Sequence, residues 1–576
     1  MAVNTSPNAS VSISWQAIAL MAVAVALVVV VRATGPSDLN QVDQPLQAAY
    51  VADILANGHY IVQFDQQGRV ATKPPLYNWL AASLIRVRGK PSEFILKFPS
   101  VLAALGTLIV TFLLAGLWLG PWTALAAALI LASGHHFFKM AYLARTDMLL
   151  CFWIILSLYA FERSRADGGP SIWNLLFWII QAMATLTKGP PGPALVHVYV
   201  LGRLALERDL RGYLRLGAWW GIPLWTALSL AWFLPALQQG GEPFVERVLK
   251  GEILFRLWGT GPRAGELQPF YAFFPWFVAR FLPWSLLATI ALLRRGKSCP
   301  LRTQSPLMPP ALWLGSMMIL LSLIPSKRAD WLMPVYPAGA ILAAHLFRQI
   351  SNPPEGPPER VIRCTRLLFL LVAALMASAG VLFLSIFALS SIHPPATALL
   401  GTIAWQASPW IAFAAGALLL WGGGAAWTGM RRLMPRLALG GFLTGLLALN
   451  LIYYHVVATP AVTLDGDELQ QFMTQVRETI PPGEKVLFGT TRTPTQFFLL
   501  SNQLYADSEN IIRSVSRGRP FWLVMRLREL QYLERGRGVS FDIVLVSNYL
   551  EYDEARLALA RWPSREHSVR PGQHQE

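Results

Sequence analysis

The chain has 576 residues, of which 54% are hydrophobic and only 14% are charged. In a soluble protein roughly a quarter of all residues are charged, so this composition excludes an ordinary water-soluble enzyme over most of the chain. The net charge of +16 does not indicate nucleic acid binding, because the basic residues lie in short loops between long apolar runs. That alternation is typical of a helical protein that crosses a membrane many times and turns its basic loops toward the cytoplasmic leaflet.

Thirteen apolar runs are long enough, or nearly so, to cross the hydrocarbon core of a bilayer. They are centred on Ile13–Val31, Val101–Leu119, Trp122–Phe138, Met148–Phe161, Trp173–Thr187, Pro191–Leu206, Trp219–Leu237, Phe274–Leu293, Met308–Ile324, Trp331–Phe347, Leu367–Leu389, Trp410–Trp427 and Leu437–Val457. A span needs about 20 apolar residues, so the shorter runs depend on flanking aromatic residues or on tilt. We therefore predict an α-helical polytopic membrane domain over residues 1–458 with about thirteen transmembrane helices.

Lys and Arg are divided unevenly between alternate loops, and this predicts the orientation. The rich loops include 203–215 and 360–366, whereas the few cations of the opposite loops lie close to span ends. Basic loops stay in the cytoplasm, so we expect a cytoplasmic N-terminus. The first long loop, 33–100, and the C-terminal end then lie on the outer side.

The first outer loop has its own structure. Leu46, Tyr50 and Ile54 form an apolar stripe that Asn57-Gly58 ends, which predicts an amphipathic helix along the membrane interface. The segments 59–64 and 70–72 flank Asp-Gln-Gln-Gly-Arg and indicate a short hairpin. Lys73-Pro-Pro then precedes a second juxtamembrane helix, Leu76–Val87.

Residues 459–576 have the composition of a water-soluble domain. Leu469–Val476 has helical spacing, and the runs 486–488, 522–525 and 543–546 are typical of buried strands between charged helices. We predict a small α/β domain on the periplasmic side, without a phosphate-binding glycine motif.

Two carboxylates near the outer span ends are candidate catalytic residues, because ionisable groups at membrane depth are costly and often functional. Asp43 either caps the helix that follows it, next to Pro45, or takes part in the reaction. Asp147, in Arg145-Thr-Asp147, either forms a structural salt bridge with Arg145 or is catalytic.

Several cations lie at the same ends. Two interpretations of Lys73 are open. The Pro-Pro step that follows it fixes the local backbone and so holds its amine at a site, or its side chain simply extends to the lipid headgroups. Lys188 lies in a Gly- and Pro-rich turn, and the Gly and Pro residues alone are enough to account for that turn. Arg256 and Lys327 belong to later outer loops, and Tyr336 follows Lys327 on the same stretch of chain. Together such groups suit a lipid phosphate: the cations neutralise it, and a carboxylate takes a proton from an acceptor.

Short motifs also occur in a characteristic order. An early Asp is followed about 30 residues later by Lys-Pro-Pro-Leu, then by Phe-Pro-Ser-Val-Leu, Ala-Arg-Thr-Asp-Met-Leu-Leu, Leu-Thr-Lys-Gly-Pro, Gln-Pro-Phe-Tyr and Ser-Lys-Arg with Tyr-Pro. In this order they resemble the C superfamily of membrane glycosyltransferases (the GT-C fold). Within it, the chain is most similar to the branch of protein O-mannosyltransferases and bacterial aminoarabinose transferases for lipid A. The resemblance runs from Asp38 to the soluble domain.

The resemblance implies transfer of a sugar, with inversion, from a polyprenyl-phosphate donor to a lipid, glycan or protein acceptor at the periplasmic face of a bacterial inner membrane. The matching positions are Asp43 and Asp147 for the acidic residues, Lys73, Arg256 and Lys188 for cations near the donor phosphate, and Tyr336 for the motif that closes over the lipid. Relatives carry Asp-Glu and then Arg-Tyr where this chain has Asp43-Gln-Pro-Leu-Gln, and Glu where it has Thr72. No particular sugar or acceptor is therefore transferred from the family.

The implied reaction is a single displacement at the anomeric carbon. Lys73 and Arg256 would stabilise the leaving phosphate, and Asp43 would deprotonate a hydroxyl acceptor; a phosphate acceptor needs no base. We expect no cofactor beyond the lipid-linked sugar and no metal, because a lone Asp among cations is a poor cage for a divalent ion.

Two other functions stay open. A transporter or flippase of lipid-linked sugars would more often show internal repeats and polar residues in mid-span, and the sequence has no convincing example of either. A non-catalytic envelope assembly subunit is the other alternative, because the Glu and Arg of the relatives are missing after Asp43.

Overall fold

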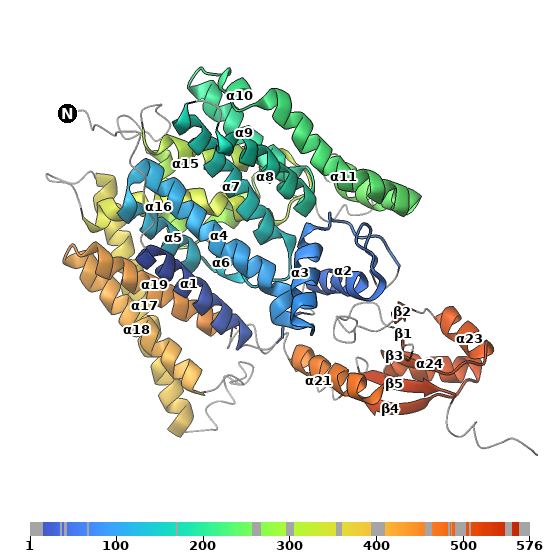
Figure 1. The fold of residues 1–576 in the computed structure, drawn as a ribbon. Coiled ribbons are helices and arrows are strands. Elements are labelled where there is room, and N and C mark those ends of the chain that lie inside the picture. The colour runs from blue at the N-terminus through green and yellow to red at the C-terminus, as the bar shows by residue number, and fades with distance from the viewer. Residues whose placement is uncertain are drawn as a thin grey trace, which may run out of the picture. The chain divides into compact units, whose positions relative to one another are not determined.

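The computed structural model describes residues 15–34, 37–39, 43–65, 68–168, 171–255, 267–294, 305–352, 360–392, 409–454, 464–481, 484, 486–489, 503–505, 508–547 and 556–563. These residues are mostly helical, with one small sheet near the C-terminus (Figure 1), which confirms the predicted fold class. The chain divides into two compact units. The first comprises Met1–Thr34, Ser100–Pro235 and Glu246–Ala458, and the second comprises Gly35–Pro99, Ala236–Val245 and Thr459–Glu576.

The predicted apolar runs lie on helices wherever the structure describes them. Outside the first loop and the C-terminal domain, the helices are α1 (Trp15–Ala33), α4 (Glu93–Leu119), α5 (Pro121–Ser133), α6 (His135–Met140), α7 (Thr146–Asp167), α8 (Ile172–Lys188), α9 (Pro191–Leu206), α10 (Gly212–Arg215), α11 (Ala218–Phe244), the π-helix η1 (Val245–Leu254), α13 (Phe273–Arg280), α14 (Trp284–Leu293), α15 (Met308–Leu323), the 3-10 helix η4 (Ala329–Val335), α16 (Tyr336–Ser351), α17 (Arg360–Ile392), α18 (Pro409–Arg431) and α19 (Pro435–Ile452). Among the described residues, five helices are long and apolar enough to cross a membrane, and α5, α14 and α15 are shorter apolar helices. The total of about thirteen spans stays a prediction.

Three runs predicted as continuous are interrupted. Trp122–Phe138 is split into α5 and α6 by Gly134, whose backbone is extended at φ −65° and ψ 126°. A Cβ atom at Gly134 would lie 2.7 Å from the Phe281 ring, so the break lets two segments approach closely. Phe274–Leu293 is divided between α13 and α14 just before Pro283, a position where proline disfavours the helical backbone. Trp331–Phe347 begins as η4 and continues as α16.

Small residues let α17, α18 and α19 pack backbone to backbone, and these helices lie side by side in Figure 1. A Cβ atom added at Gly441 of α19 would lie 2.3 Å from the backbone nitrogen of Ala426 and 2.6 Å from the carbonyl oxygen of Gly422, both in α18. On the other side of α18, a Cβ at Gly423 would lie 2.4 Å from the nitrogen of Ala377 in α17. Such close approach is a common way for membrane helices to associate.

We expect Gly441→Leu to separate α18 from α19 and to lower the melting temperature in detergent by several degrees or more, because overpacking costs about 1–3 kcal/mol even where the backbone can shift. Gly440→Leu is the matched control, since a Cβ at Gly440 meets nothing within 4 Å. Equal melting temperatures for the two variants would contradict this account of the packing.

In the second unit, the first loop folds largely as predicted. The helix α2 (Gln44–Asn57) ends at Gly58, which has φ 71° and donates its N–H to the carbonyl of Ile54. The helix α3 (Leu76–Arg88) agrees with the predicted second helix to within one residue at its end. The predicted hairpin is reduced to one antiparallel bridge, Phe64 with Val70, beside an Asp65–Arg69 ion pair of 2.8 Å.

A buried lysine ties the start of this loop to the first turns of α4. The ammonium of Lys97 binds the carboxylates of Asp38 and Glu93, and the Ser37 hydroxyl donates to Glu93 at 2.7 Å. Because Lys97 is only 1% exposed, losing either carboxylate would leave a poorly compensated buried charge. We interpret this cluster as structural.

The C-terminal domain is a five-stranded sheet with helices on both faces. Its elements are α21 (Leu464–Thr479), β1 (Val486–Phe488), β2 (Gln503–Tyr505), α23 (Ser508–Ser516), β3 (Phe521–Arg526), α24 (Leu527–Arg537), β4 (Asp542–Val546) and β5 (Leu557–Trp562). The strand order is β2-β1-β3-β5-β4, with β1 parallel to β2 and β3, and β5 antiparallel to β3 and β4.

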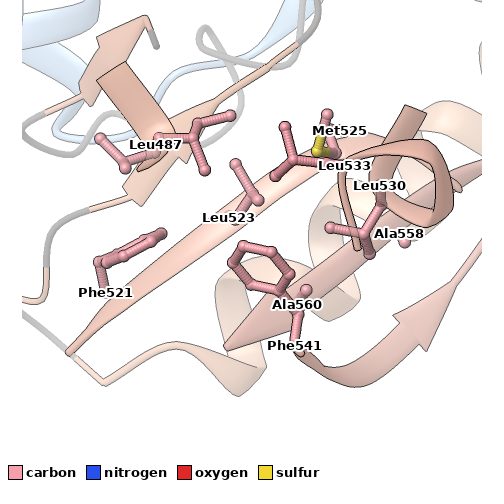
Figure 2. Close-up of a cluster of buried hydrophobic side chains, with 10 residues drawn as sticks. Leu487, Phe521, Leu523, Met525, Leu530, Leu533, Phe541, Ala558 and Ala560 are labelled. Carbon is pink, nitrogen blue, oxygen red and sulfur yellow. The ribbon is translucent and has the colours of Figure 1, made fainter. Parts of the chain in front are cut away.

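Alternating strand residues contribute to two hydrophobic cores, one on each face of the sheet. Trp522 and Val524 of β3 pack with Phe472, Met473 and Val476 of α21. The other face holds Phe521, Leu523 and Met525 together with Leu530 and Leu533 of α24 (Figure 2), and Ile511 of α23 belongs to the same cluster. The domain is therefore a three-layer α/β unit.

Three details of the sheet differ from the prediction. The strand β4 is not buried, because it is an edge strand whose Ile543 and Val544 are each 39% exposed. The strand β5 was missed, because Leu-Ala-Leu-Ala-Arg-Trp contains no β-branched residue and consists largely of strong helix formers. β2, only three residues long, was missed as well.

Candidate active site

A chain of buried and half-buried polar side chains lies in the first unit. We call it the Asp147–Asp330 network, and its members are His136, Arg145, Asp147, Lys188, Asp330 and Tyr336. The Arg145 guanidinium lies at the centre, 3.2 Å from a carboxylate oxygen of Asp147 and 2.7 Å from one of Asp330. The second oxygen of Asp147 binds the ammonium of Lys188. Both oxygens of Asp147 are therefore occupied by cations.

Helix ends place these charges. Asp147 lies in the first turn of α7, where the helix dipole favours a negative charge, and Arg145 precedes that turn in an extended conformation. Lys188 is the last residue of α8, where the dipole favours a cation. Gly189 follows with φ 80°, a backbone conformation that glycine adopts without strain. Thus Gly189 makes the turn, as its sequence context suggested, and Lys188 also has a specific partner.

At the other end of the network, His136 joins Asp330 to Tyr336. Its Nε2 is 3.0 Å from an Asp330 oxygen, and its Nδ1 is 2.8 Å from the Tyr336 hydroxyl. An ionised carboxylate only accepts hydrogen bonds, so Nε2 carries the proton and donates it. In the neutral ring Nδ1 then accepts from the Tyr336 hydroxyl. Burial by itself would raise the pKa of the Asp330 carboxyl, but the His136 hydrogen bond and the Arg145 charge hold that pKa well below its usual range.

Two further cations lie beside Asp330. Arg280 is 3.6 Å from an Asp330 oxygen, and its side chain is 39% exposed. Lys139 is half-buried, and burial lowers its pKa; Asp330 acts against that shift and Arg280 adds to it. Among the described residues of this region, four cations, Arg145, Lys188, Arg280 and Lys139, surround the carboxylates of Asp147 and Asp330, so cations outnumber carboxylates. Such an excess favours an anionic group.

The structure brings together three of the predicted site residues, Asp147, Lys188 and Tyr336, as members of one network. The Arg145–Asp147 pairing foreseen from the sequence is present. Tyr336 is fully buried and stacks on Phe277 at a centroid distance of 5.8 Å, so in this conformation its ring has no exposed surface for a lipid. Its predicted contact with the lipid is untested.

The other predicted residues have different surroundings. The ammonium of Lys327 donates to the backbone carbonyls of Ile324 at 2.6 Å and Gln268 at 3.1 Å, which ties two loop segments together. Asp43 is the N-cap residue of α2 and makes no side-chain capping bond, although Pro45 occupies the first turn as expected. Lys73 is half-buried, and Arg256 lies outside the described residues. The predicted roles of these four residues stay predictions.

Sequence reasoning missed four members of this region: His136, Asp330, Arg280 and Lys139. Asp330 stands in Ser-Lys-Arg-Ala-Asp-Trp, a stretch noted only for its cations, and His136 follows the glycine that breaks an apolar run. Charged or imidazole groups at such breaks were the available signal. The described residues contain no group of three or more His, Cys, Asp or Glu side chains placed to hold a metal ion, and the expected independence of metal stays a prediction.

Comparison with known proteins agrees with this architecture. Residues 72–237 match the model of the family described as dolichyl-phosphate-mannose-protein mannosyltransferase. A Pseudomonas aeruginosa protein named undecaprenyl phosphate-alpha-4-amino-4-deoxy-L-arabinose arabinosyl transferase is 30% identical over 314 residues, which are 53% of this chain and 55% of that protein. An uncharacterised Aquifex aeolicus protein is 29% identical over 327 residues, 54% of this chain and 61% of that protein. The chain thus spans little more than half the length of these relatives.

The fold similarity extends much further than the sequence similarity. The crystal structure of ArnT from Cupriavidus metallidurans bound to undecaprenyl phosphate superposes with a TM-score of 0.69 and 17% identity, over 95% of this chain and 98% of that one. The apo structure of the same protein superposes with a TM-score of 0.68 and 18% identity, over 94% of this chain and 97% of that one. The resemblance seen in the sequence is thereby confirmed: the chain is similar in fold to ArnT, and part of it matches the model of a mannosyltransferase family.

Proposed function

We propose that the protein is an integral-membrane glycosyltransferase that moves a sugar from a polyprenyl-phosphate donor to a lipid, glycan or protein acceptor at the periplasmic face of a bacterial inner membrane. The observation that carries this proposal is the Asp147–Asp330 network together with the cations Arg280 and Lys139 that lie beside Asp330. A relative named for a reaction with undecaprenyl phosphate, and a neighbour of the same fold with that lipid bound, supply the class of donor.

The cations beside Asp330 suit the proposed chemistry. A polyprenyl-phosphate sugar is a phosphodiester with one negative charge, and its departure leaves a phosphate monoester with a second developing charge. Preorganised cations therefore interact more strongly with the transition state than with the bound donor, which is the condition for catalysis. We assign that role to Arg280 and Lys139, because they retain exposed surface while Arg145 is almost fully buried.

Asp147 is better suited to positioning than to proton transfer. Its two oxygens bind Arg145 and Lys188, so neither is available to take a proton from an acceptor. Its proposed task is to hold these cations in place. The base for a hydroxyl acceptor, where one is needed, is Asp43 of the first loop, and Lys73 and Arg256 are proposed as further phosphate ligands on the strength of the family resemblance.

The composition of α7 argues against the transporter alternative. Asp147 and Glu162 lie at opposite ends of this helix, and the intervening residues 148–161 include no charged side chain. A transporter site would more often place polar groups in the middle of a span. Charges at the helix ends instead favour chemistry at the membrane surface.

The test is the mass of lipids and envelope glycans from cells with the protein, without it, and with Asp43→Ala or Lys73→Ala. We expect one envelope molecule to lose a single sugar mass in the deletion and in both variants, whereas Asp209→Asn, in an exposed ion pair with Arg215, behaves as wild type. Loss of that mass in the deletion only would remove Asp43 and Lys73 from the reaction. Unchanged masses with lipid-linked sugars redistributed across the bilayer would favour the transporter.

A further inference from the structure

The two helical layers of the C-terminal domain carry opposite charge. Residues 508–538, which form α23, β3 and α24, hold seven arginines, three glutamates and no lysine. The arginines are Arg513, Arg517, Arg519, Arg526, Arg528, Arg535 and Arg537, and all seven are exposed. The helix α21 on the other face of the sheet holds four acidic residues and one arginine. The domain therefore has a basic layer and an acidic layer, with the sheet between them.

The packing of α24 fixes which residues it presents to solvent. Leu530 and Leu533 point into the core beneath the helix, where they meet Leu523 and Phe541 (Figure 2). Helical spacing then places Arg528, Tyr532 and Arg535 along the opposite side of α24. We call these three residues the α24 stripe. Tyr532 is 79% exposed, so an aromatic ring stands between two guanidinium groups.

This arrangement has the chemistry of a phosphate-headgroup surface. The planar guanidinium matches phosphate oxygens with paired hydrogen bonds, and arginine is less strongly hydrated than lysine. Tyrosine is enriched where an apolar region meets water, as at the level of lipid headgroups. The acidic α21 layer would be repelled by the same surface. Opposite charges on the two layers thus give the domain a preferred orientation toward an anionic plane.

The chain also keeps this domain near a bilayer. The helix α19, a candidate membrane span, ends at Ile452, and α21 begins at Leu464. A fully extended segment of that length reaches at most about 40 Å, so the domain is tethered close to the end of a span. Tethering raises the effective concentration of lipid headgroups around the basic layer.

We propose that the α24 stripe and the neighbouring arginines of residues 508–538 dock on the anionic phospholipid headgroups of the membrane in which the chain is embedded. The docking is independent of sugar transfer, so failure of the transferase proposal leaves it standing, and its test uses no glycosylation readout.

The test compares spin labels in the full-length protein, with Cys299→Ser and Cys364→Ser, reconstituted in nanodiscs. One label is at Gln531→Cys beside the α24 stripe, and the matched label is at Gln475→Cys, an exposed position on α21. The discs contain phosphatidylcholine alone or with phosphatidylglycerol. We expect only the Gln531 label to lose collisions with a water-soluble relaxing agent when phosphatidylglycerol is present, and to regain them at about 0.5 M salt, where screening is strong.

Charge reversal provides the second comparison. The double variant Arg528→Glu/Arg535→Glu is expected to lose the lipid-dependent protection, whereas Arg477→Glu on α21 keeps it. Equal accessibility of the Gln531 label in both kinds of disc would overturn the proposal, as would parallel changes at Gln531 and Gln475. Protection that needs an added envelope protein, and not phosphatidylglycerol, would also overturn it and assign the basic layer to a protein partner.

Discussion

Asp147→Ala is expected to destabilise the protein by about 3–5 kcal/mol, because it removes one partner of a buried ion pair and leaves the other charge uncompensated. Asp147 is only 5% exposed, and its carboxylate is the partner of the Lys188 ammonium and one of two carboxylates beside Arg145. Sugar transfer should fall by about 10²-fold or more, since the cations lose their fixed positions. Unfolding by denaturant in detergent and transfer to the native acceptor are the two measurements.

A double variant separates the two effects. In Asp147→Ala/Lys188→Met the unpaired ammonium is removed and Arg145 keeps Asp330, so stability should recover by about 1–3 kcal/mol relative to Asp147→Ala. Transfer should not recover, because Lys188 is then also missing. If Asp147→Ala were as stable and as active as Asp209→Asn, the network would be neither structural nor functional.

The fold was predictable to the extent that it follows from local pattern. Apolar runs predict helices, and Gly58 at the end of α2 and Pro75 before α3 show how single residues fix helix boundaries. The interruption at Gly134 was not predictable in this way. The Phe281 ring occupies the space that a side chain at position 134 would need, and the two residues are far apart in the sequence.

The candidate site likewise has one part that local sequence predicts and another part that it does not. Arg145 and Asp147 are two residues apart, and their salt bridge could be foreseen. Lys188 was selected as a single cation, but its partner on another helix was not identified. Asp330 was overlooked, because its importance comes from His136 and Arg145, which lie almost 200 residues earlier in the chain. Spatial convergence of this kind has no local signature in one sequence.

Asp330→Asn is expected to lower sugar transfer by about 10²-fold while the protein still folds, because a displacement of about 1 Å in a supporting group is enough for such a loss. The amide keeps the shape of the side chain, and its oxygen can accept the hydrogen bond from His136. It removes the negative charge that faces Arg145 at 2.7 Å and Arg280 at 3.6 Å. The measurement is transfer at varied donor concentration, together with the melting temperature.

The direction of the change in donor affinity tests the assignment of Arg280. Without the Asp330 charge, Arg280 and Lys139 are less neutralised, so the ground-state donor phosphate should bind at least as tightly as before. The turnover number should fall, because Arg145 and Arg280 are no longer held in a fixed geometry. A weaker donor affinity with an unchanged turnover number would mean that Asp330 only shapes the binding pocket, and the cations beside it would then have no part in the chemical step.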